Sequence, residues 1–571
     1  MKILRTYLLS LIFTLIFAGC SDDRHPTYGG TFSSAIYNSP STFTARNIND
    51  LYSTKVVNQI MEGLVGLDPK TLQPTLKIAR NVEISEDGLT YTFEIKEDVY
   101  FHPHKELQTN NKLSPEDVLA TFKLICTRIN NEKSLAYSTV FENNVVGAEE
   151  FYNKQSTELK GVQIDNNSII IKLIKKDTKF LDKLSSVTTS ILSKKLIEKG
   201  QDHALIGTGP FKYHDTQFIN DKKAIVLTKN QDYHKADATG TRLPYLDTII
   251  FYVIPDKNEQ LSFFKDEKID ILEELPPHKI TKILEERMSD FSSIPPKLLL
   301  KRKPLLGTQY YIFNLKKDIF KDKRIRQAIN YAVDKEQIMH EILNDQAYGI
   351  GDAGLVPPNS FAGYDVEEIK KYGYTFQPQK ARRLLSEAGF PNGKGFPTID
   401  LKFNLSDIHT AVAENFANQM KSVLNINVTI SGLTFKEQDR NLKTGNGDLF
   451  RTSWYADYYS VESFLQNGYG KTVPENDTSV SLVNSARFQN EEFDKHYEAG
   501  KNTSNTVDRY AHFLKAEKIM VEEAPFIILW YEESILLTHA YVKNLELNSL
   551  CYFDLSEVYL KPWTSEAYSK K

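Results

Sequence analysis

Apolar residues fall on every second position over residues 89–95: Leu89, Tyr91, Phe93 and Ile95. Polar residues occupy the positions between them, which is the period of a strand with one buried face. The Glu86-Asp87-Gly88 segment before it is typical of a turn. We therefore predict a half-buried strand that begins after this turn.

The pattern changes to a helical period after Ser114. Ser114 can cap a helix, Pro115 suits its first position, and Asp117 stands where a capping box places an acid. Val118, Phe122 and Ile125 then share one face. A strand, a loop and a helix are predicted for this region.

The second half of the chain repeats both periods. Asp322 can cap a helix with one apolar face, and Pro378 opens another that ends at Gly389. A strand at 399–403, a helix at about 408–424 and an alternating segment at 426–430 together predict a β-α-β unit. This order indicates an α/β protein.

The N-terminus has the pattern of an export signal. Lys2 and Arg5 precede an apolar run, and Phe17-Ala18-Gly19-Cys20 has the form of a small-residue cleavage site. The apolar run is shorter than the roughly 20 residues that a bilayer requires. A plain signal peptide and a membrane span are the alternatives. We predict a signal peptide over 1–20, lipidation of Cys20 and a tether over 21–30.

Composition narrows the classes of function. The chain has 571 residues, 41% of them hydrophobic, which is enough for two or three domains. Its net charge is -4, so nucleic acid is not expected as a partner. After Cys20, only Cys126 and Cys551 remain. Two cysteines define no disulfide framework. The alternatives are therefore a disulfide between them or two buried free thiols.

No motif demands catalysis. The sequence has no His-Glu-x-x-His, no Gly-x-Ser-x-Gly and no phosphate loop. His102 and His104 could hold a metal, but two loop histidines are more often exposed bystanders. We predict no enzyme, no cofactor and no metal site.

Residues 62–122 resemble, from end to end, the bacterial extracellular solute-binding proteins of the oligopeptide and dipeptide type. Their loop departs from the family, since His102-Pro103-His104 and a polar insertion replace a short glycine turn. Further blocks that resemble the family follow in order: Val146–Tyr152, Gly207–Lys212, Asn230–Tyr233, Leu243–Asp247, Phe313-Asn314, Lys323–Asp334 and Lys380–Gly389.

The resemblance implies a two-lobe periplasmic-binding-protein fold of type II with a ligand cleft between the lobes. Lobe I would comprise residues 30–66, 205–296 and 526–565, with an extra subdomain inserted at 67–204. Lobe II would comprise residues 297–525. The crossings would lie near Pro295 to Pro304 and near Ala524 to Tyr531.

The resemblance also implies ligand contacts in the segment from Arg451 to Tyr458. Asp457 would pair with the α-amino group of a peptide, since a buried ammonium needs an opposite charge. The alternative is that Asp457 only organises a turn. Arg451 would meet the C-terminal carboxylate, or would be a surface charge on a strand. Arg440 is a candidate for a shorter ligand.

The same resemblance places a peptide between a strand in each lobe, so that backbone hydrogen bonds supply the affinity. The first strand contains Ala35, Ile36 and Tyr37, and the second contains Trp454 and Tyr455. Tyr37, Trp454 and Tyr458 are the aromatic residues expected near the ligand. Each would otherwise be a core residue.

We therefore predict a monomeric, lipid-anchored receptor in the cell envelope that captures oligopeptides for an ATP-driven (ABC) importer in the inner membrane. Asp22-Asp23 after the lipidated position resembles a surface-export signal, so exposure at the cell surface stays open. Two alternatives remain. One is the same fold with another solute, such as a dipeptide, a nickel complex or an oligosaccharide. The other is an exported hydrolase, for which no motif is present.

Overall fold

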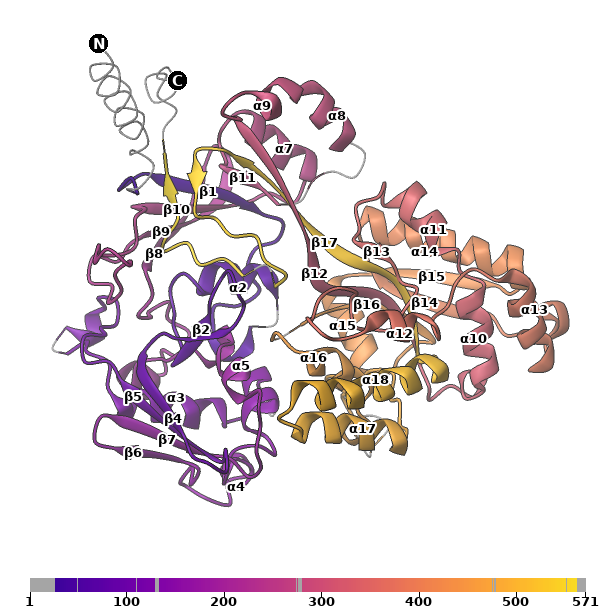
Figure 1. Cartoon of the computed structure of the whole chain (residues 1–571), viewed down its shortest axis with the longest axis horizontal. Helices are drawn as coiled ribbons and strands as arrows, with labels where there is room; N and C mark the ends of the chain where they lie inside the picture. The colour runs from indigo at the N-terminus through magenta and orange to yellow at the C-terminus, as the bar shows by residue number, and fades with distance from the viewer. Residues whose placement is uncertain are drawn as a thin grey trace, which may run out of the picture.

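The computed structural model describes residues 26–48, 50–108, 110–128, 133–273, 275, 280–456, 458–474, 476, 479–550 and 552–561. Two lobes lie side by side, and the long strands β12 (Leu298–Phe313) and β17 (Phe526–His539) run between them (Figure 1). The predicted lipidation site Cys20 lies outside the described residues. No helix among the described residues is long and apolar enough to cross a membrane.

One mixed sheet extends through both lobes in the order β15-β14-β16-β12-β17-β11-β1-β10-β9-β8, with β13 also paired to β17. Its other strands are β1 (Thr31–Ile36), β8 (Phe211–Ile219), β9 (Lys222–Lys229), β10 (Thr248–Val253), β11 (Ile271–Leu272), β13 (Gly349–Ile350), β14 (Ile399–Asn404), β15 (Val428–Leu433) and β16 (Leu449–Tyr455). The predicted α/β fold class is confirmed.

The two crossing strands are antiparallel. Their pairing begins at Leu298 with His539 and shifts register between Pro304 and Thr308. Proline has no N–H to donate to a ladder, so an irregularity is expected there. In lobe I, β17 pairs with β11; in lobe II, it pairs with β13. The division between the lobes therefore falls inside β17, and residue 526 lies at its lobe II end.

The inserted subdomain has its own sheet, in the order β4-β5-β7-β6. Its strands are β4 (Ala79–Ile84), β5 (Thr90–Ile95), β6 (Val162–Asp165) and β7 (Ser168–Lys172), with a small β2 (Val65–Leu67) and β3 (Pro74–Leu76) pair beside it. The predicted alternation is confirmed, because Tyr91, Phe93 and Ile95 are buried.

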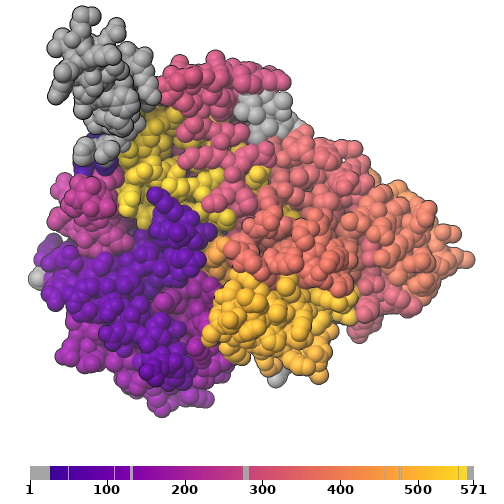
Figure 2. All heavy atoms as spheres, in the orientation of Figure 1, coloured from indigo at the N-terminus to yellow at the C-terminus, as the bar shows by residue number. Residues whose placement is uncertain are grey.

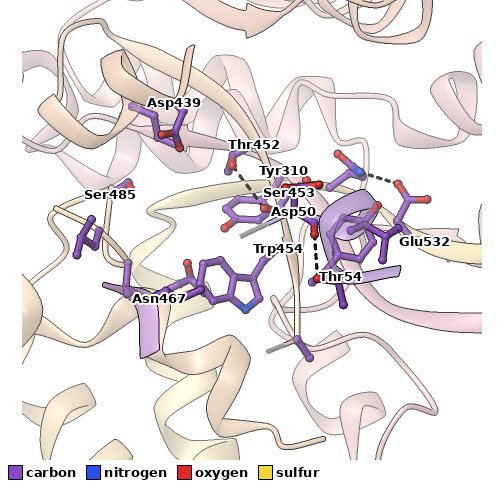
Figure 3. Close-up of a pocket in the computed structure, with 18 of the residues that line it drawn as sticks. Asp50, Thr54, Tyr310, Asp439, Thr452, Ser453, Trp454, Asn467, Ser485 and Glu532 are labelled. Carbon is purple, nitrogen blue, oxygen red and sulfur yellow. Dashed lines mark hydrogen bonds between the residues drawn. The ribbon is translucent and has the colours of Figure 1, made fainter. Parts of the chain in front are cut away.

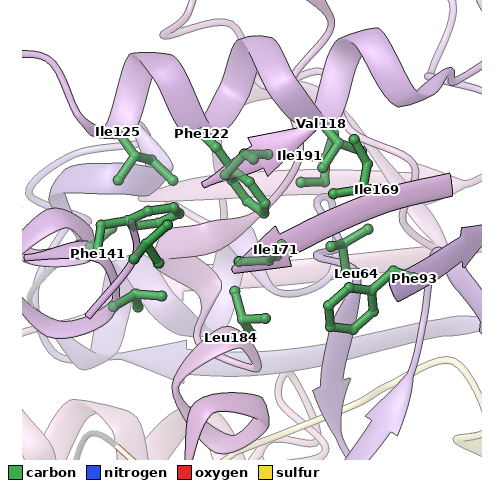
Figure 4. Close-up of a cluster of buried hydrophobic side chains, with 14 of the residues drawn as sticks. Leu64, Phe93, Val118, Phe122, Ile125, Phe141, Ile169, Ile171, Leu184 and Ile191 are labelled. Carbon is green, nitrogen blue, oxygen red and sulfur yellow. The ribbon is translucent and has the colours of Figure 1, made fainter. Parts of the chain in front are cut away.

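The helix predicted after Ser114 is also confirmed. α3 (Pro115–Ile125) begins with a capping box in which Ser114 and Asp117 take part. Figure 4 shows Val118, Phe122 and Ile125 directed at Ile169 and Ile171 of β7. The hydrophobic face of one helix on one face of a sheet thus forms the core of this subdomain.

Lobe II contains the predicted β-α-β unit. β14 and β15 are parallel, with Ile399 opposite Val428, and α14 (Asp407–Gln419) connects them. The helix predicted after Asp322 is α10 (Lys323–Tyr331), and the one opened by Pro378 is α13 (Pro378–Glu387). Lobe II also holds α11 (Lys335–Gln337), α12 (Val366–Lys370), α15 (Phe435–Thr444), α16 (Glu462–Leu465), α17 (Glu491–Asn502) and α18 (Thr506–Glu523).

The remaining helices flank lobe I and the subdomain: α2 (Leu51–Val57), α4 (Ala148–Tyr152), α5 (Phe180–Leu184), α6 (Lys194–Glu198), α7 (Lys257–Lys265), α8 (Ile280–Glu286) and α9 (Met288–Ser292). Two short strands, β18 (Val542–Lys543) and β19 (Tyr559–Leu560), pair near the C-terminus.

Two local expectations can be compared with the structure. Cys126 is buried with a free thiol, whereas Cys551 lies outside the described residues.

The expectation that His102 is exposed is wrong. It is 2% exposed, its Nε2 lies 3.0 Å from the Gly209 carbonyl, and burial is the main cause that lowers its pKa to about 4. No group of three metal-ligating side chains occurs in the described ranges.

Candidate functional site: the cleft between the lobes

A cavity of about 3230 Å³ lies between the lobes. Its walls come from α2 and residues 255–258 of lobe I, from the inserted subdomain, from the crossing strands and from β14–β16 with α14 and α15 of lobe II. Small-molecule pockets usually measure about 300–1,000 Å³. This cleft has room for a larger ligand together with water.

The edge of β16 runs into this cavity. β14 pairs with β16 only at Leu449 and Phe450 and ends at Asn404, so the described chain supplies no strand on that side of Ser453. On the other side, β12 pairs along the whole strand. The N–H of Ala456 donates to the Leu306 carbonyl at 2.9 Å. Main-chain groups alternate in an antiparallel ladder, so those of Ser453 point away from β12 into the cleft.

A polar network covers one face of this strand. Arg451 Nη1 donates to Asn404 Oδ1 at 2.9 Å, and Arg451 Nη2 donates to Gln309 Oε1. Gln309 Nε2 in turn donates to Glu532 Oε1 at 2.6 Å, which also accepts from Trp530 Nε1 at 3.1 Å. Strands β12, β14, β16 and β17 therefore each contribute a member of one network.

Burial perturbs the charged groups of this network. It lowers the pKa of Arg451 and raises the pKa of Glu532, whose hydrogen bonds from Gln309 and Trp530 oppose the shift. Burial and then the Arg451 charge lower the pKa of His409 to about 3, so His409 is neutral at pH 7. Within the described part of the chain, Arg451 makes hydrogen bonds to neutral acceptors and no ion pair.

The opposite face of β16 presents aromatic and amide side chains. Trp454 lies beside Asn467 in the close-up, with Thr452 and Tyr310 along the same wall (Figure 3). The indole Nε1 of Trp454 is buried without a hydrogen-bond partner. Gln438 on α15 donates to the Lys402 and Arg451 carbonyls at 3.0 Å each, which holds α15 against this part of the sheet.

Most of the site residues predicted from the sequence line the cavity, and some do not. Asp457 lies outside the described residues, so its pairing with an amine stays a prediction. Arg451, Trp454, Tyr455, Tyr458, Arg440 and Tyr37 all line the cavity. Ala35 and Ile36 belong to hydrophobic clusters and do not line it. Their side chains therefore belong to the core.

Gln309, Asn404 and Glu532 were not among the residues predicted from the sequence. The sequence does mark Glu532 as unusual, because Glu532 and Glu533 interrupt the apolar run of β17. An acid in the middle of a central strand is unusual unless it has a function or a partner. Gln309 and Asn404 carried no comparable signal.

A second polar cluster joins the lobes at the far end of the cleft. Lys183 of the inserted subdomain lies 2.8 Å from Asp177 and 3.4 Å from Glu462 of lobe II. Lys501 lies 3.5 Å from the same Glu462. Burial alone would lower the pKa of Lys183, but Glu462 and Asp177 outweigh it and raise the pKa above its ordinary value.

A hydrogen bond from Arg509 Nη2 to Thr178 Oγ1, at 2.8 Å, adds to this contact. In Figure 2 the surface of α17 and α18 meets that of the inserted subdomain. The two lobes are therefore in direct contact at this end, while the cavity remains between them elsewhere.

Comparison with known proteins identifies the family. The family profile of the bacterial extracellular solute-binding proteins, family 5 Middle, matches residues 73–476. The chain belongs to this family. The resemblance proposed from the sequence is thus confirmed, and the family is one of solute-binding receptors.

Individual members of family 5 align over most of the chain. Heme-binding protein A of Haemophilus influenzae is 27% identical, and the alignment covers 83% of this chain and 81% of that protein. The dipeptide-binding protein of Escherichia coli is 24% identical over 86% of each chain.

A solved structure supports the two-lobe fold of this solute-binding protein. The ABC transporter-associated periplasmic binding protein DppA of Helicobacter pylori, in complex with the peptide STSA, superposes with a TM-score of 0.78 at 23% identity. The superposition covers 94% of this chain and 99% of that one. The predicted two-lobe periplasmic-binding-protein fold is confirmed.

Proposed function

We propose that this solute-binding protein captures oligopeptides in the cleft and delivers them to an ATP-driven importer. The carrying observation is the edge of β16 at Ser453, which faces the cavity and has no strand on that side among the described residues. An extended peptide adds to such an edge through main-chain hydrogen bonds that do not depend on its sequence. Peptide-binding relatives of similar length support the same ligand class.

The two faces of β16 give alternate ligand side chains different surroundings. One face carries Arg451 and Glu532, and the other carries Trp454 and Asn467. Successive side chains of a strand point to opposite faces, so a bound peptide would place every second residue in each pocket. The cavity volume leaves room for water around them.

Arg451 is the proposed partner of the peptide carboxylate. A partly buried guanidinium whose hydrogen bonds go to neutral acceptors gains from an anion that joins it. Asn404 and Gln309 accept the hydrogen bonds of Arg451, and Glu532 is a nearby negative charge. Asp457 is the proposed partner of the α-amino group, six residues further along the same segment.

The decisive experiment is native mass spectrometry of residues 21–571 purified without denaturation. Adducts at peptide masses that are lost on unfolding would support the proposal. A single non-peptide adduct would overturn it in favour of another solute. A folded protein without any adduct, which also fails to bind added peptides in calorimetry, would overturn it as well.

A backbone variant tests the augmentation itself. Ser453→Pro removes an N–H that points into the cleft and makes no bond to β12, so the sheet should persist. Peptide affinity should fall about tenfold, which corresponds to one hydrogen bond of about 1.4 kcal/mol. Ser453→Ala is the matched control and should bind normally. Equal affinity of both variants, with equal melting temperatures, would refute the β16 edge as the docking strand.

The cellular setting is part of the same proposal. The signal over 1–20 supports export and a lipid anchor at Cys20, with residues 21–30 as a tether. Cys20→Ser should release the protein from the membrane fraction of an expressing bacterium. We propose a monomer that acts without catalysis, and labelled peptides should be recovered intact after incubation.

A further inference from the structure

Two large apolar side chains stand exposed in the cleft. Leu405 is 62% exposed and Phe435 is 67% exposed, and both line the cavity. Exposed apolar residues gathered at a binding site indicate contact with an apolar group. Leu433 and Ile408 extend this surface, which we call the apolar wall: Leu405, Ile408, Leu433 and Phe435.

The chain order explains why these residues lie together. β14 and β15 are parallel neighbours, with Asn404 opposite Leu433, and both end at the cleft. The N–H of Leu405 donates to the Leu433 carbonyl at 2.9 Å. Thr434 then caps α15, which makes Phe435 the first residue of that helix.

The same register relates the apolar wall to the docking edge. Leu401 is opposite Leu449 and Lys402 is opposite Phe450 in the parallel pair β14·β16. β14 ends at Asn404, opposite Thr452 if this register continues, and Leu405 is the next residue. The apolar wall therefore begins where β14 stops beside β16, and a peptide that pairs with Ser453 lies next to it.

The turn of lobe I that opens α7 is polar. Residues 256–258, at the start of α7, are Asp256, Lys257 and Asn258, and they line the cavity. This turn and the apolar wall line the same cavity from different lobes.

We infer that the apolar wall is a side-chain subsite for a bulky apolar residue, such as leucine or phenylalanine, of the bound peptide. The inference rests on the proposed peptide-binding function and adds a preference to it. A large apolar side chain at this position replaces water on Leu405 and Phe435 and gains the free energy of burial. An alanine or a glutamate at this position does not gain this free energy of burial.

The test compares four peptides on the whole receptor by competition in native mass spectrometry and by calorimetry: Ala-Ala-Ala, Ala-Leu-Ala, Ala-Ala-Leu and Ala-Glu-Ala. At least one leucine peptide should bind about tenfold more tightly than Ala-Ala-Ala, because the apolar wall removes its leucine side chain from water. Ala-Glu-Ala should bind no better than Ala-Ala-Ala.

Variants assign the preference to the apolar wall. Leu405→Ser/Phe435→Ser should lose most of the tenfold preference for a leucine peptide over Ala-Ala-Ala. Phe435→Leu should keep it. Val507→Ser, at an exposed apolar site on α18 outside the cavity, is the matched control. A preference that survives in the double variant, or four equal affinities in the parent, would overturn the inference and leave the proposed function intact. Failure of every peptide to bind would instead overturn the proposed function.

Discussion

Lys183 offers the sharpest test of how the lobes are held together. Lys183→Met removes a buried cation and leaves the carboxylates of Asp177 and Glu462 in place. Removing one partner of a buried ion pair typically costs about 3–5 kcal/mol.

The remaining contacts reduce that cost. Asp177 still accepts hydrogen bonds from Asn144 Nδ2 at 3.1 Å and from the Lys179 N–H at 2.9 Å. Glu462 still has Lys501 at 3.5 Å. We therefore expect a loss of about 2–3 kcal/mol in unfolding free energy, which lowers the thermal midpoint by about 2 °C in a chain of this length.

Differential scanning calorimetry of the ligand-free protein measures this shift. Lys194→Met is the matched control, because Lys194 forms an exposed pair with Glu198 at 3.5 Å on the same subdomain and such pairs contribute little. The triple variant Lys183→Met/Asp177→Asn/Glu462→Gln, which leaves no unpaired carboxylate at Lys183, should recover part of the loss. Equal midpoints for Lys183→Met and Lys194→Met would refute the assigned role of this cluster.

Three further predictions concern single carboxyl groups. Tyr364 and the Val356 N–H donate hydrogen bonds to Glu517, but burial outweighs them and raises its pKa to about 7. Because the folded protein holds this proton more tightly than the unfolded chain does, the free energy of unfolding should fall by about 3 kcal/mol as pH rises from 4.5 to 7. Glu517→Gln should lack this part of the pH dependence in melting curves at pH 5 and pH 8, and identical pH slopes would contradict the assignment. Burial alone would raise the pKa of Glu62, but His234, Lys235 and Lys77 lower it to about 2. The stabilisation of the folded protein by ionised Glu62 is therefore present above pH 4.5 and is lost as pH falls toward 2. Glu62→Gln should lower the free energy of unfolding by about 3 kcal/mol in urea at pH 7. An unchanged urea midpoint would contradict this role of Glu62. Asp457→Asn should weaken peptide binding by about 2 kcal/mol with an unchanged melting temperature of the ligand-free protein, and calorimetry with unaltered affinity would remove Asp457 from the site.

Local patterns were enough to predict the elements of the fold. The alternation over residues 89–95 became β5, the cap at Ser114 became the start of α3, and the β-α-β pattern became β14, α14 and β15. Each of these depends on residues close in sequence, whose period reports which face meets a core.

The cleft was only partly predictable. Arg451, Trp454 and Tyr455 were found because one strand carries them all. Their partners could not be found in this way, since Gln309 and Glu532 stand on the two crossing strands and Asn404 on a third. His102 was misjudged for a similar reason, because the backbone that buries it lies more than a hundred residues away.

The amino-acid order by itself determined the family, the α/β class and the segment of lobe II that enters the cleft. Only the tertiary structure decided that Ser453 lies beyond the end of β14, that Leu405 follows that end, and that Lys183 spans the lobes to Glu462. Periodicity records whether a side chain points inward or outward along its own element. Which distant elements meet, and whether a partner or open space lies opposite, depends on how the elements pack.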